Sequence, residues 1–244
     1  LGKILTQHFT IPGIIPAPSS QEREEGVMWY RMAAIQEYPT AQCNLGVCYY
    51  QGNGTNTNKV EAMKWYLLAA NQGHAAAQLN CGYRYHDGDG VSKNHSDSLK
   101  WFQMAALQGD GTALWMVGLH YKEGKSIKQD KVEAFKWSKL AAERGNSDAQ
   151  LELGACYYNG EGVKQDYEQA VKWTELSAKQ GNVHAKFNLG GFYHLGTGVK
   201  RDDGKTLKLW KEAQEGGNPQ AQFQMGLILM NGDEKGKDLV QATQ

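Results

Sequence analysis

One glycine recurs at a constant interval of 36 residues along this 244-residue chain. It stands at Gly46, Gly82, Gly118, Gly154, Gly190 and Gly226. A fixed period of this length is typical of repeat proteins, in which each repeat is one supersecondary unit that cannot bury its apolar face alone. The spacing therefore predicts a stack of similar units, stabilised by contacts between neighbours rather than by one central core.

Other residue types keep the same register. The sets are Ala41, Ala77, Ala113, Ala149, Ala185 and Ala221, five before the glycine; Tyr49, Tyr85, Tyr121, Tyr157 and Tyr193, three after it; Trp29, Trp65, Trp101, Trp137 and Trp173; and the unit-closing Gly73, Gly109, Gly145, Gly181 and Gly217. The Trp set shifts by one residue to Trp210, where Leu209 takes the expected place. One Trp per repeat indicates packing rather than a cofactor site.

Two helices fit between these marks in each unit. We expect helix A near 41–51, a Gly-x-Gly turn, helix B near 58–72, and Gly73 as the helix stop. Apolar residues fall on one stripe of each helix, so each helix needs its neighbours to be buried. A glycine inside helix A costs about 1 kcal/mol relative to Ala. Its recurrence predicts that a neighbouring helix approaches closely there.

The chain divides into an N-terminal segment and a repeat array. Residues 1–20 contain Pro12, Pro16 and Pro18 among apolar residues and are expected to be extended, as a linker against the first helix or as a tail that docks on a terminal or neighbouring surface. The array spans 21–244, with a half repeat at 22–40, full repeats at 41–76, 77–112, 113–148, 149–184 and 185–220, and a half repeat at 221–244. Lone helices are expected at 22–38 and 219–231, with Val240 and Ala242 where the next helix B would begin. The array looks cut from a longer one, and Leu1 indicates a processed chain or a fragment.

Composition narrows the classes of partner. Lys plus Arg and Asp plus Glu both total 26, so no global field attracts nucleic acid or anionic lipid. No apolar run is long enough to span a bilayer, which predicts a soluble protein without membrane insertion, cytoplasmic or, after signal removal, periplasmic or secreted. The four cysteines, Cys43, Cys48, Cys81 and Cys156, show no regular pairing and are expected to be reduced thiols in the core.

The combined pattern resembles the Sel-one-like repeat, a relative of the tetratricopeptide repeat. It includes Ala77-Gln78, Gly82, Tyr85, Gly88-x-Gly90-Val91, Trp101, Ala105-Ala106 and Gln108-Gly109, and extends from residue 22 onwards. The resemblance implies an all-α, right-handed α-α superhelical solenoid with the A helices on its concave face, and adaptor roles in assembly, quality control, secretion or bacterial contacts with hosts and rivals. Ser126 replaces the second turn glycine, which puts that turn's geometry in doubt, and the irregular cysteines disfavour the cysteine-rich branch of the family.

The same resemblance implies which residues face a ligand. Positions two before, one after and four after the recurring glycine vary between repeats and would line the groove. The candidate partner-binding residues are Asn44, Val47, Tyr50, Asn80, Tyr83, His86, Trp115, Leu119, Lys122, Glu152, Tyr158, Asn188 and His194. Amides suit the backbone of an extended peptide, and aromatic residues suit binding hot spots. Trp115, Phe187 and Phe223 lie three before the glycine, where core packing is favoured, and exposed asparagines are equally often merely solvated.

The sequence offers few residues that could form an enzyme active site. Two after the glycine stand Cys48, Arg84, His120, Cys156 and Phe192, so a thiol site could pair His120 with Cys156 on adjacent A helices. No third group is evident, and such helices lie roughly 10 Å apart. Asp87-Gly88-Asp89-Gly90 lacks the spaced ligands of a calcium loop and is interpreted as a turn, so neither metal nor cofactor is expected.

The sequence thus predicts a non-enzymatic scaffold that binds a partner protein or peptide. One alternative is a bacterial immunity or virulence-associated adaptor that caps a toxin or a host protein. An alternative of another class is a thiol enzyme or hydrolase carried on the repeats. The partner's identity and the oligomeric state stay open.

Overall fold

The structure is a computed structural model, and it describes residues 17–230. Most of the expected extended segment 1–20, and Val240 and Ala242, lie outside the described residues. All regular secondary structure within 17–230 is helical. The predicted fold class, an all-α solenoid of 36-residue helix-turn-helix repeats, is confirmed.

The described residues form twelve helices. They are α1 (Ser20–Ile35), α2 (Pro39–Gln51), α3 (Lys59–Asn71), α4 (Ala75–Asp87), α5 (His95–Leu107), α6 (Gly111–Glu123), α7 (Lys131–Glu143), α8 (Ser147–Asn159), α9 (Tyr167–Lys179), α10 (Val183–Leu195), α11 (Asp203–Glu215) and α12 (Pro219–Met230). The even-numbered helices are the A helices, and the odd-numbered ones are the B helices.

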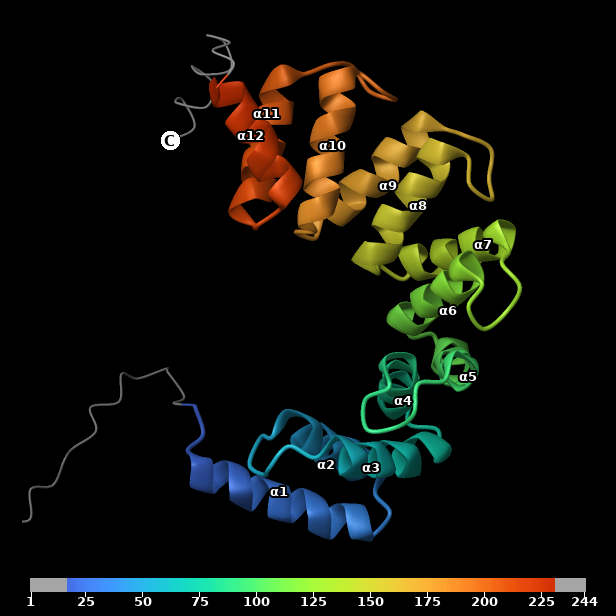
Figure 1. Cartoon of the computed structure of the whole chain (residues 1–244), viewed down its shortest axis with the longest axis vertical. Coiled ribbons are helices and arrows are strands. Elements are labelled where there is room, and N and C mark those ends of the chain that lie inside the picture. The colour runs from blue at the N-terminus through green and yellow to red at the C-terminus, as the bar shows by residue number, and fades with distance from the viewer. Residues whose placement is uncertain (1–16, 231–244) are drawn as a thin grey trace, which may run out of the picture. The chain divides into compact units, whose positions relative to one another are not determined.

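The chain divides into two compact units, and each is described by itself. Unit 1 holds α1 to α3 together with residues 89–91, and unit 2 holds α4 to α12. Within each unit, helix A packs mainly against the helix B of the same repeat, and helix B packs against the next helix A. Figure 1 shows the helices of unit 2 following one another as such pairs.

Recurring residues fix where helix B begins and where helix A ends. Each helix B from α3 to α11 begins after an Asn or Asp whose side chain accepts a hydrogen bond from a first-turn N–H, as Asp166 does from Gln169 at 3.0 Å. Such caps satisfy donors that have no partner within the helix. At the other end of helix A, Gly160 has a left-handed φ of 72°, which a glycine adopts without strain.

The recurring glycine of helix A touches the helix B of its own repeat. A Cβ on Gly46 would lie 2.7 Å from the ring of Tyr66, and one on Gly82 would lie 2.5 Å from the ring of Phe102. Real Cβ atoms essentially never approach other atoms this closely, so a larger residue would force the ring or the helix to shift. The predicted close approach is therefore confirmed in these repeats. At Gly226 in α12, no neighbouring atom is recorded within 4 Å.

The partner of this glycine is the residue that follows the Trp position. Those residues are Tyr66, Phe102, Ser138, Thr174 and Trp210, and all are buried. Trp210 is therefore not a shifted member of the Trp set, because it belongs to this second set. Its indole lies against Gly190, and its Nε1–H donates to the carbonyl of Phe187 at 3.1 Å.

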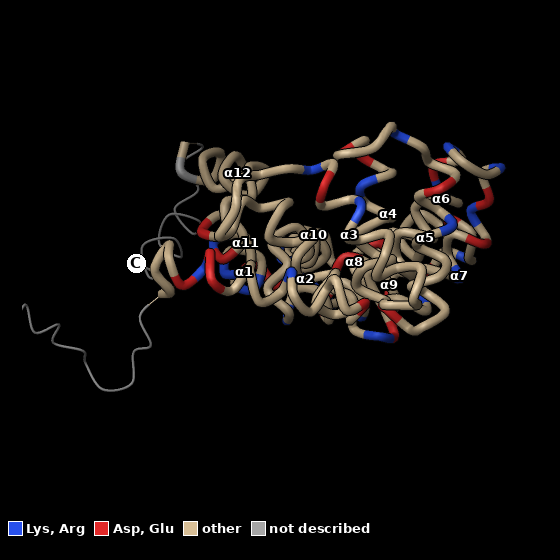
Figure 2. Tube along the Cα trace, turned by 90° about the horizontal axis from the view of Figure 1, so that it is seen from below, with Lys and Arg blue, Asp and Glu red and all other residues tan. Residues whose placement is uncertain are grey.

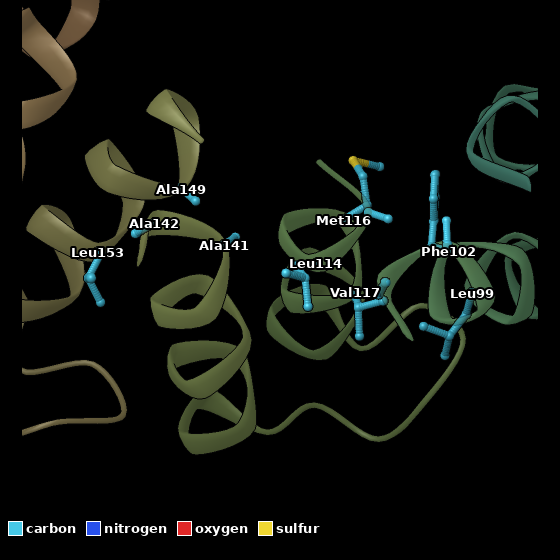
Figure 3. Close-up of a cluster of buried hydrophobic side chains, with 12 residues drawn as sticks. Leu99, Phe102, Leu114, Met116, Val117, Ala141, Ala142, Ala149 and Leu153 are labelled. Atoms are coloured by element: carbon cyan, nitrogen blue, oxygen red, sulfur yellow. The ribbon is translucent and has the colours of Figure 1, made fainter. Parts of the chain in front are cut away.

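Small and large apolar side chains alternate through the core of unit 2. Ala113, Ala141 and Ala149 are fully buried, and they pack with Val117 and Leu153. Figure 3 shows this cluster, in which Leu99 and Phe102 of α5 join side chains of α6, α7 and α8. Trp137 and Trp173 pack at the margin of this cluster, and Trp65 packs against the core of unit 1, which supports the expected packing role of the Trp set.

The turn that lacks a second glycine takes another conformation. In regular turns the second glycine is left-handed, with φ of 71° at Gly162, and it packs against the carbonyl of Lys131. Ser126 stands at this position in the α6–α7 turn and does not adopt a positive φ. Its hydroxyl instead contacts Nδ1 of His120 at 2.7 Å. The expected departure in turn geometry is confirmed, and it brings a polar group onto His120.

Charge is evenly mixed over the described helices. Figure 2 shows Lys and Arg interspersed with Asp and Glu along the chain, in keeping with equal totals of both signs. Of the helices within residues 17–230, none is both long and apolar enough to cross a membrane.

Candidate partner-binding face

The sequence-predicted site residues lie on the A helices, where packing leaves them partly uncovered. We call this set the A-helix face; it comprises Asn44, Val47 and Tyr50 on α2, Asn80, Tyr83 and His86 on α4, Trp115, Leu119 and Lys122 on α6, Glu152 and Tyr158 on α8, and Asn188 and His194 on α10. All are half-buried or exposed. Met116, which occupies the position two before the glycine in α6, is buried at 7% exposure and so is not part of the face.

Part of the face is already used by contacts within the chain. In unit 1, the hydroxyl of Tyr50 donates to Asp89 at 3.0 Å, and Lys59 pairs with the same carboxylate at 2.8 Å. In unit 2, Tyr83 packs edge-on against Phe102, with ring centroids 5.2 Å apart. Tyr50 and Tyr83 are therefore held in place by neighbours as well as partly exposed.

Lys122 and Glu152 join adjacent A helices. Their charged atoms lie 2.6 Å apart, between α6 and α8. Burial alone would lower the pKa of Lys122, but the hydrogen bond and the negative charge of Glu152 outweigh it and raise that pKa. The two predicted site residues thus neutralise each other and leave little net charge at this part of the face.

Three histidines meet beside α4, α5 and α6. The rings of His86, His95 and His120 have centroid separations between 5.4 and 6.3 Å. His86 contacts the carboxylate of Asp87 at 2.8 Å, whereas Nε2 of the buried His120 lies 3.4 Å from the hydroxyl of Ser98. Among the residues that the structure describes, no group of acidic, His or Cys side chains is arranged to hold a metal ion.

A pocket opens between α8 and α10. Its volume is about 260 Å³, and its lining residues are Ala155, Tyr158, Thr174, Phe187, Asn188, Gly191, Phe192 and Leu195. Tyr158 and Asn188 were predicted as site residues, Ala155 and Gly191 belong to a column that was expected to line the groove, and the other four residues were not predicted. The pocket forms because Ala155 and Gly191 follow the recurring glycine, where α2, α4 and α6 carry Val47, Tyr83 and Leu119. The consecutive glycines at 190 and 191 were the sequence signal for it.

Phe187 has two roles at this pocket. Its ring stacks on Trp210 at a centroid distance of 6.0 Å, and it packs against the cluster of Leu207, Trp210 and Met225. The expected core packing of Phe187 is therefore confirmed. The same residue also forms part of the pocket wall.

The geometry does not support a pairing of His120 with Cys156. His120 contacts Ser126 and Ser98, and the Sγ of Cys156 faces the carboxylate of Glu152 at 3.9 Å. Burial, reinforced by the charge of Glu152, raises the pKa of Cys156 to about 12. A thiol with this pKa holds its proton at neutral pH and is a poor nucleophile. All four cysteines are buried thiols, as predicted.

Stacked helical hairpins with a variable face on the A helices define the class of α-helical repeat proteins. The Sel1 repeat family matches residues 17–38, 39–74, 75–110, 111–146, 147–182, 183–218 and 219–244. The chain therefore belongs to the Sel1 repeat family, whose members are generally protein-interaction scaffolds. A comparison with curated proteins gives no match.

Solved structures agree with this assignment. A Sel1 repeat protein from Oxalobacter formigenes is 31% identical with a TM-score of 0.81, and the match covers 92% of each chain. A protective antigen of uropathogenic Escherichia coli is 35% identical with a TM-score of 0.77 over 87% of this chain. The chain spans only 45% of that antigen's length. An immunity protein from Pseudomonas aeruginosa shares the fold at 22% identity and a TM-score of 0.52.

Proposed function

We propose that this chain is a scaffold that binds an extended segment of a partner protein on the A-helix face. One observation carries the proposal. The positions one and four after the recurring glycine vary between repeats and are partly or fully exposed in α2 to α12, whereas the recurring Ala positions of the same helices are buried by packing. A rigid framework that presents a row of variable side chains is the usual arrangement of a repeat-protein binding surface.

The chemistry of the face suits an extended peptide. Asn188 offers an amide that can pair with a peptide backbone, whereas Nδ2 of Asn80 already donates to the carbonyl of Ala76 at 2.9 Å. Tyr158 and Leu119 add apolar surface, and the Lys122–Glu152 pair adds no net charge. Peptide recognition of this kind combines main-chain hydrogen bonds with pockets for individual side chains.

A second exposed surface, on the B helices, is the competing location for a partner-binding site. Met104, Leu140 and Leu176 occupy the same position on α5, α7 and α9 and are between 36% and 48% exposed. These three residues form an apolar stripe on the B helices, which we call the B-helix stripe. Because exposed apolar side chains also mark interaction sites, the experiment has to separate the two surfaces.

The proposal is tested with a peptide selected from a random library against the native chain. We expect Asn80→Lys and His194→Glu, which place charges on the A-helix face, to weaken binding of that peptide at least about tenfold. Leu140→Lys, on the B-helix stripe, is the matched control and is expected to leave the dissociation constant unchanged. Loss of binding in Leu140→Lys alone, or a library that yields no binding peptide, would overturn the proposal.

The immunity role remains the alternative. The Pseudomonas aeruginosa structures named as immunity proteins are 19% and 22% identical to this chain, which supports the shared fold alone. No feature of the described residues favours a toxin over another protein partner.

A further inference from the structure

The pocket between α8 and α10 is a place where three side chains are small at once. In the α4–α5 repeat, Tyr83 and Phe102 occupy the positions one after the recurring glycine and opposite it, and their rings are in contact. In the α8–α9 repeat the corresponding residues are Ala155 and Thr174, and in α10 Gly191 follows the recurring glycine. A Cβ built on Gly191 would meet no atom within 4 Å. The pocket is therefore a local absence of side-chain volume in an otherwise regular stack.

The chemistry of the wall selects an uncharged occupant. None of the eight lining residues is Asp, Glu, Lys, Arg or His, and the large ones, Phe187, Phe192, Leu195 and Tyr158, are aromatic or aliphatic. A charged group placed there would lose its hydration without gaining a partner. The Lys and the Glu of the A-helix face, Lys122 and Glu152, already neutralise each other at 2.6 Å.

The size of the pocket also limits the occupant. Sites for whole small-molecule ligands usually enclose about 300–1,000 Å³. The present pocket is smaller, at about 260 Å³, and it opens onto the A-helix face. This volume suits one large side chain that reaches in from a chain lying outside.

A polar group at the wall can hold that chain. Within residues 17–230 the side-chain amide of Asn188 has no hydrogen-bond partner, and the residue is exposed. By contrast, Nδ2 of Asn80 in α4 donates to the carbonyl of Ala76 at 2.9 Å. The amide of Asn188 is thus available to pair with the backbone on either side of an inserted side chain.

We infer that this pocket is a specificity site that receives one large apolar side chain, aromatic or long aliphatic, from an extended segment of the partner protein. The inference rests on the proposed function and names the chemistry of the partner at one point of the face. The segment carries no charge at the anchoring position, and its backbone pairs with Asn188.

The test fills the pocket without disturbing the fold. Gly191→Leu places a side chain where Tyr83 and Leu119 stand in other repeats, and Gly191→Ala is the matched control that adds only one carbon. Both variants are expected to unfold at or above the temperature of the native chain, because helix propensity improves at an open position. A random peptide library is selected on the native chain, and the dissociation constants of a selected peptide are measured for all three proteins.

We expect the selected peptides to share one large apolar position. Gly191→Leu should weaken binding at least about tenfold, and Gly191→Ala should have little effect. A peptide with its apolar anchor changed to Ala should bind weakly and equally to the native chain and to Gly191→Leu. Equal binding of the intact peptide to both proteins would overturn the pocket assignment, as would selected peptides without a shared apolar position.

The outcomes separate this inference from the proposed function. If Asn80→Lys weakens binding and Gly191→Leu does not, the A-helix face stands and the pocket assignment fails. If neither substitution matters, both fail. Free indole or toluene could displace the peptide while the intact peptide and its anchor-to-Ala version bind with equal affinity. That result would identify a small-molecule pocket and contradict the inference.

Discussion

The imidazole of His120 lies among groups that oppose its protonation. It is only 4% exposed, and burial is the main cause that lowers its pKa from 6.5 to about 4. The charges of His86, His95 and Lys125 add to this effect, and Glu123 opposes it. In the unfolded chain the pKa returns to about 6.5, so the unfolded state binds the proton more readily between these two values. Acidification through this window therefore favours unfolding.

This linkage predicts a pH-dependent contribution of His120 to stability. The free energy of unfolding of the native chain, minus that of His120→Gln, should shrink by about 2 kcal/mol between about pH 7.5 and about pH 5. Urea unfolding at several pH values measures this difference, and His194→Gln, at an exposed position of α10, is the matched control. A difference for His120→Gln that stays constant over the range would contradict the assigned burial.

The role of a residue was predictable from the sequence where the same residue recurs in every repeat. It was not predictable where a feature depends on several different residues together. The Ala column and the Gly column from Gly46 to Gly190 identified buried positions, because one packing requirement is repeated in every unit, whereas the Tyr column is only half-buried. The contact of His120 with Ser126 was not predicted, since it depends on one departure from the pattern. The pocket was missed for a similar reason. It requires Ala155, Thr174 and Gly191 to be small together, and these residues come from three helices.

Between two paired helices, the recurring glycine determines how closely the helices approach each other. In the α8–α9 pair, a Cβ on Gly154 would collide with the hydroxyl of Thr174 and lie 3.1 Å from the carbonyl oxygen of Ala170. The backbone of α9 cannot yield as a flexible side chain can. A larger residue at 154 must therefore push the two helices apart.

Gly154→Leu is accordingly expected to destabilise the protein by about 2 kcal/mol, the overpacking penalty exceeding the gain in helix propensity. Thermal unfolding followed by circular dichroism measures the effect. Gly191→Leu makes the same chemical change in α10, where no atom opposes it, and should not lower the midpoint. Equal midpoints for Gly154→Leu and the native chain would rule out the proposed role of the glycine.

Helix bounds were predicted closely because the turns carry strong local signals. Helix A was expected near 41–51 and is Pro39–Gln51; helix B was expected near 58–72 and is Lys59–Asn71. The capping residues Asn58, Asn94, Asp130, Asp166 and Asp202 also recur every 36 residues. The prediction of the helix bounds did not use this set, although a recurring N-cap residue predicts where every helix B begins. The partner of the recurring glycine was missed because the more conspicuous Trp stands one residue before it.

At the scale of the whole molecule, the proposed function assigns packing and partner recognition to different sets of residues. The residues that recur make the packing contacts between successive helices, and these contacts stabilise each unit. Under the proposed function, the variable residues one and four after the recurring glycine lie on the A-helix face, where they would distinguish one partner from another. Substitution on the face would then change specificity without loss of the stack.

Hydrogen exchange, measured by mass spectrometry with and without a library-selected peptide, tests this division most directly. The account predicts that the peptide slows exchange in the A helices α8 and α10 of unit 2, and leaves α7 and α9, with the B-helix stripe residues Leu140 and Leu176, unchanged. Protection confined to α7 and α9 would contradict it.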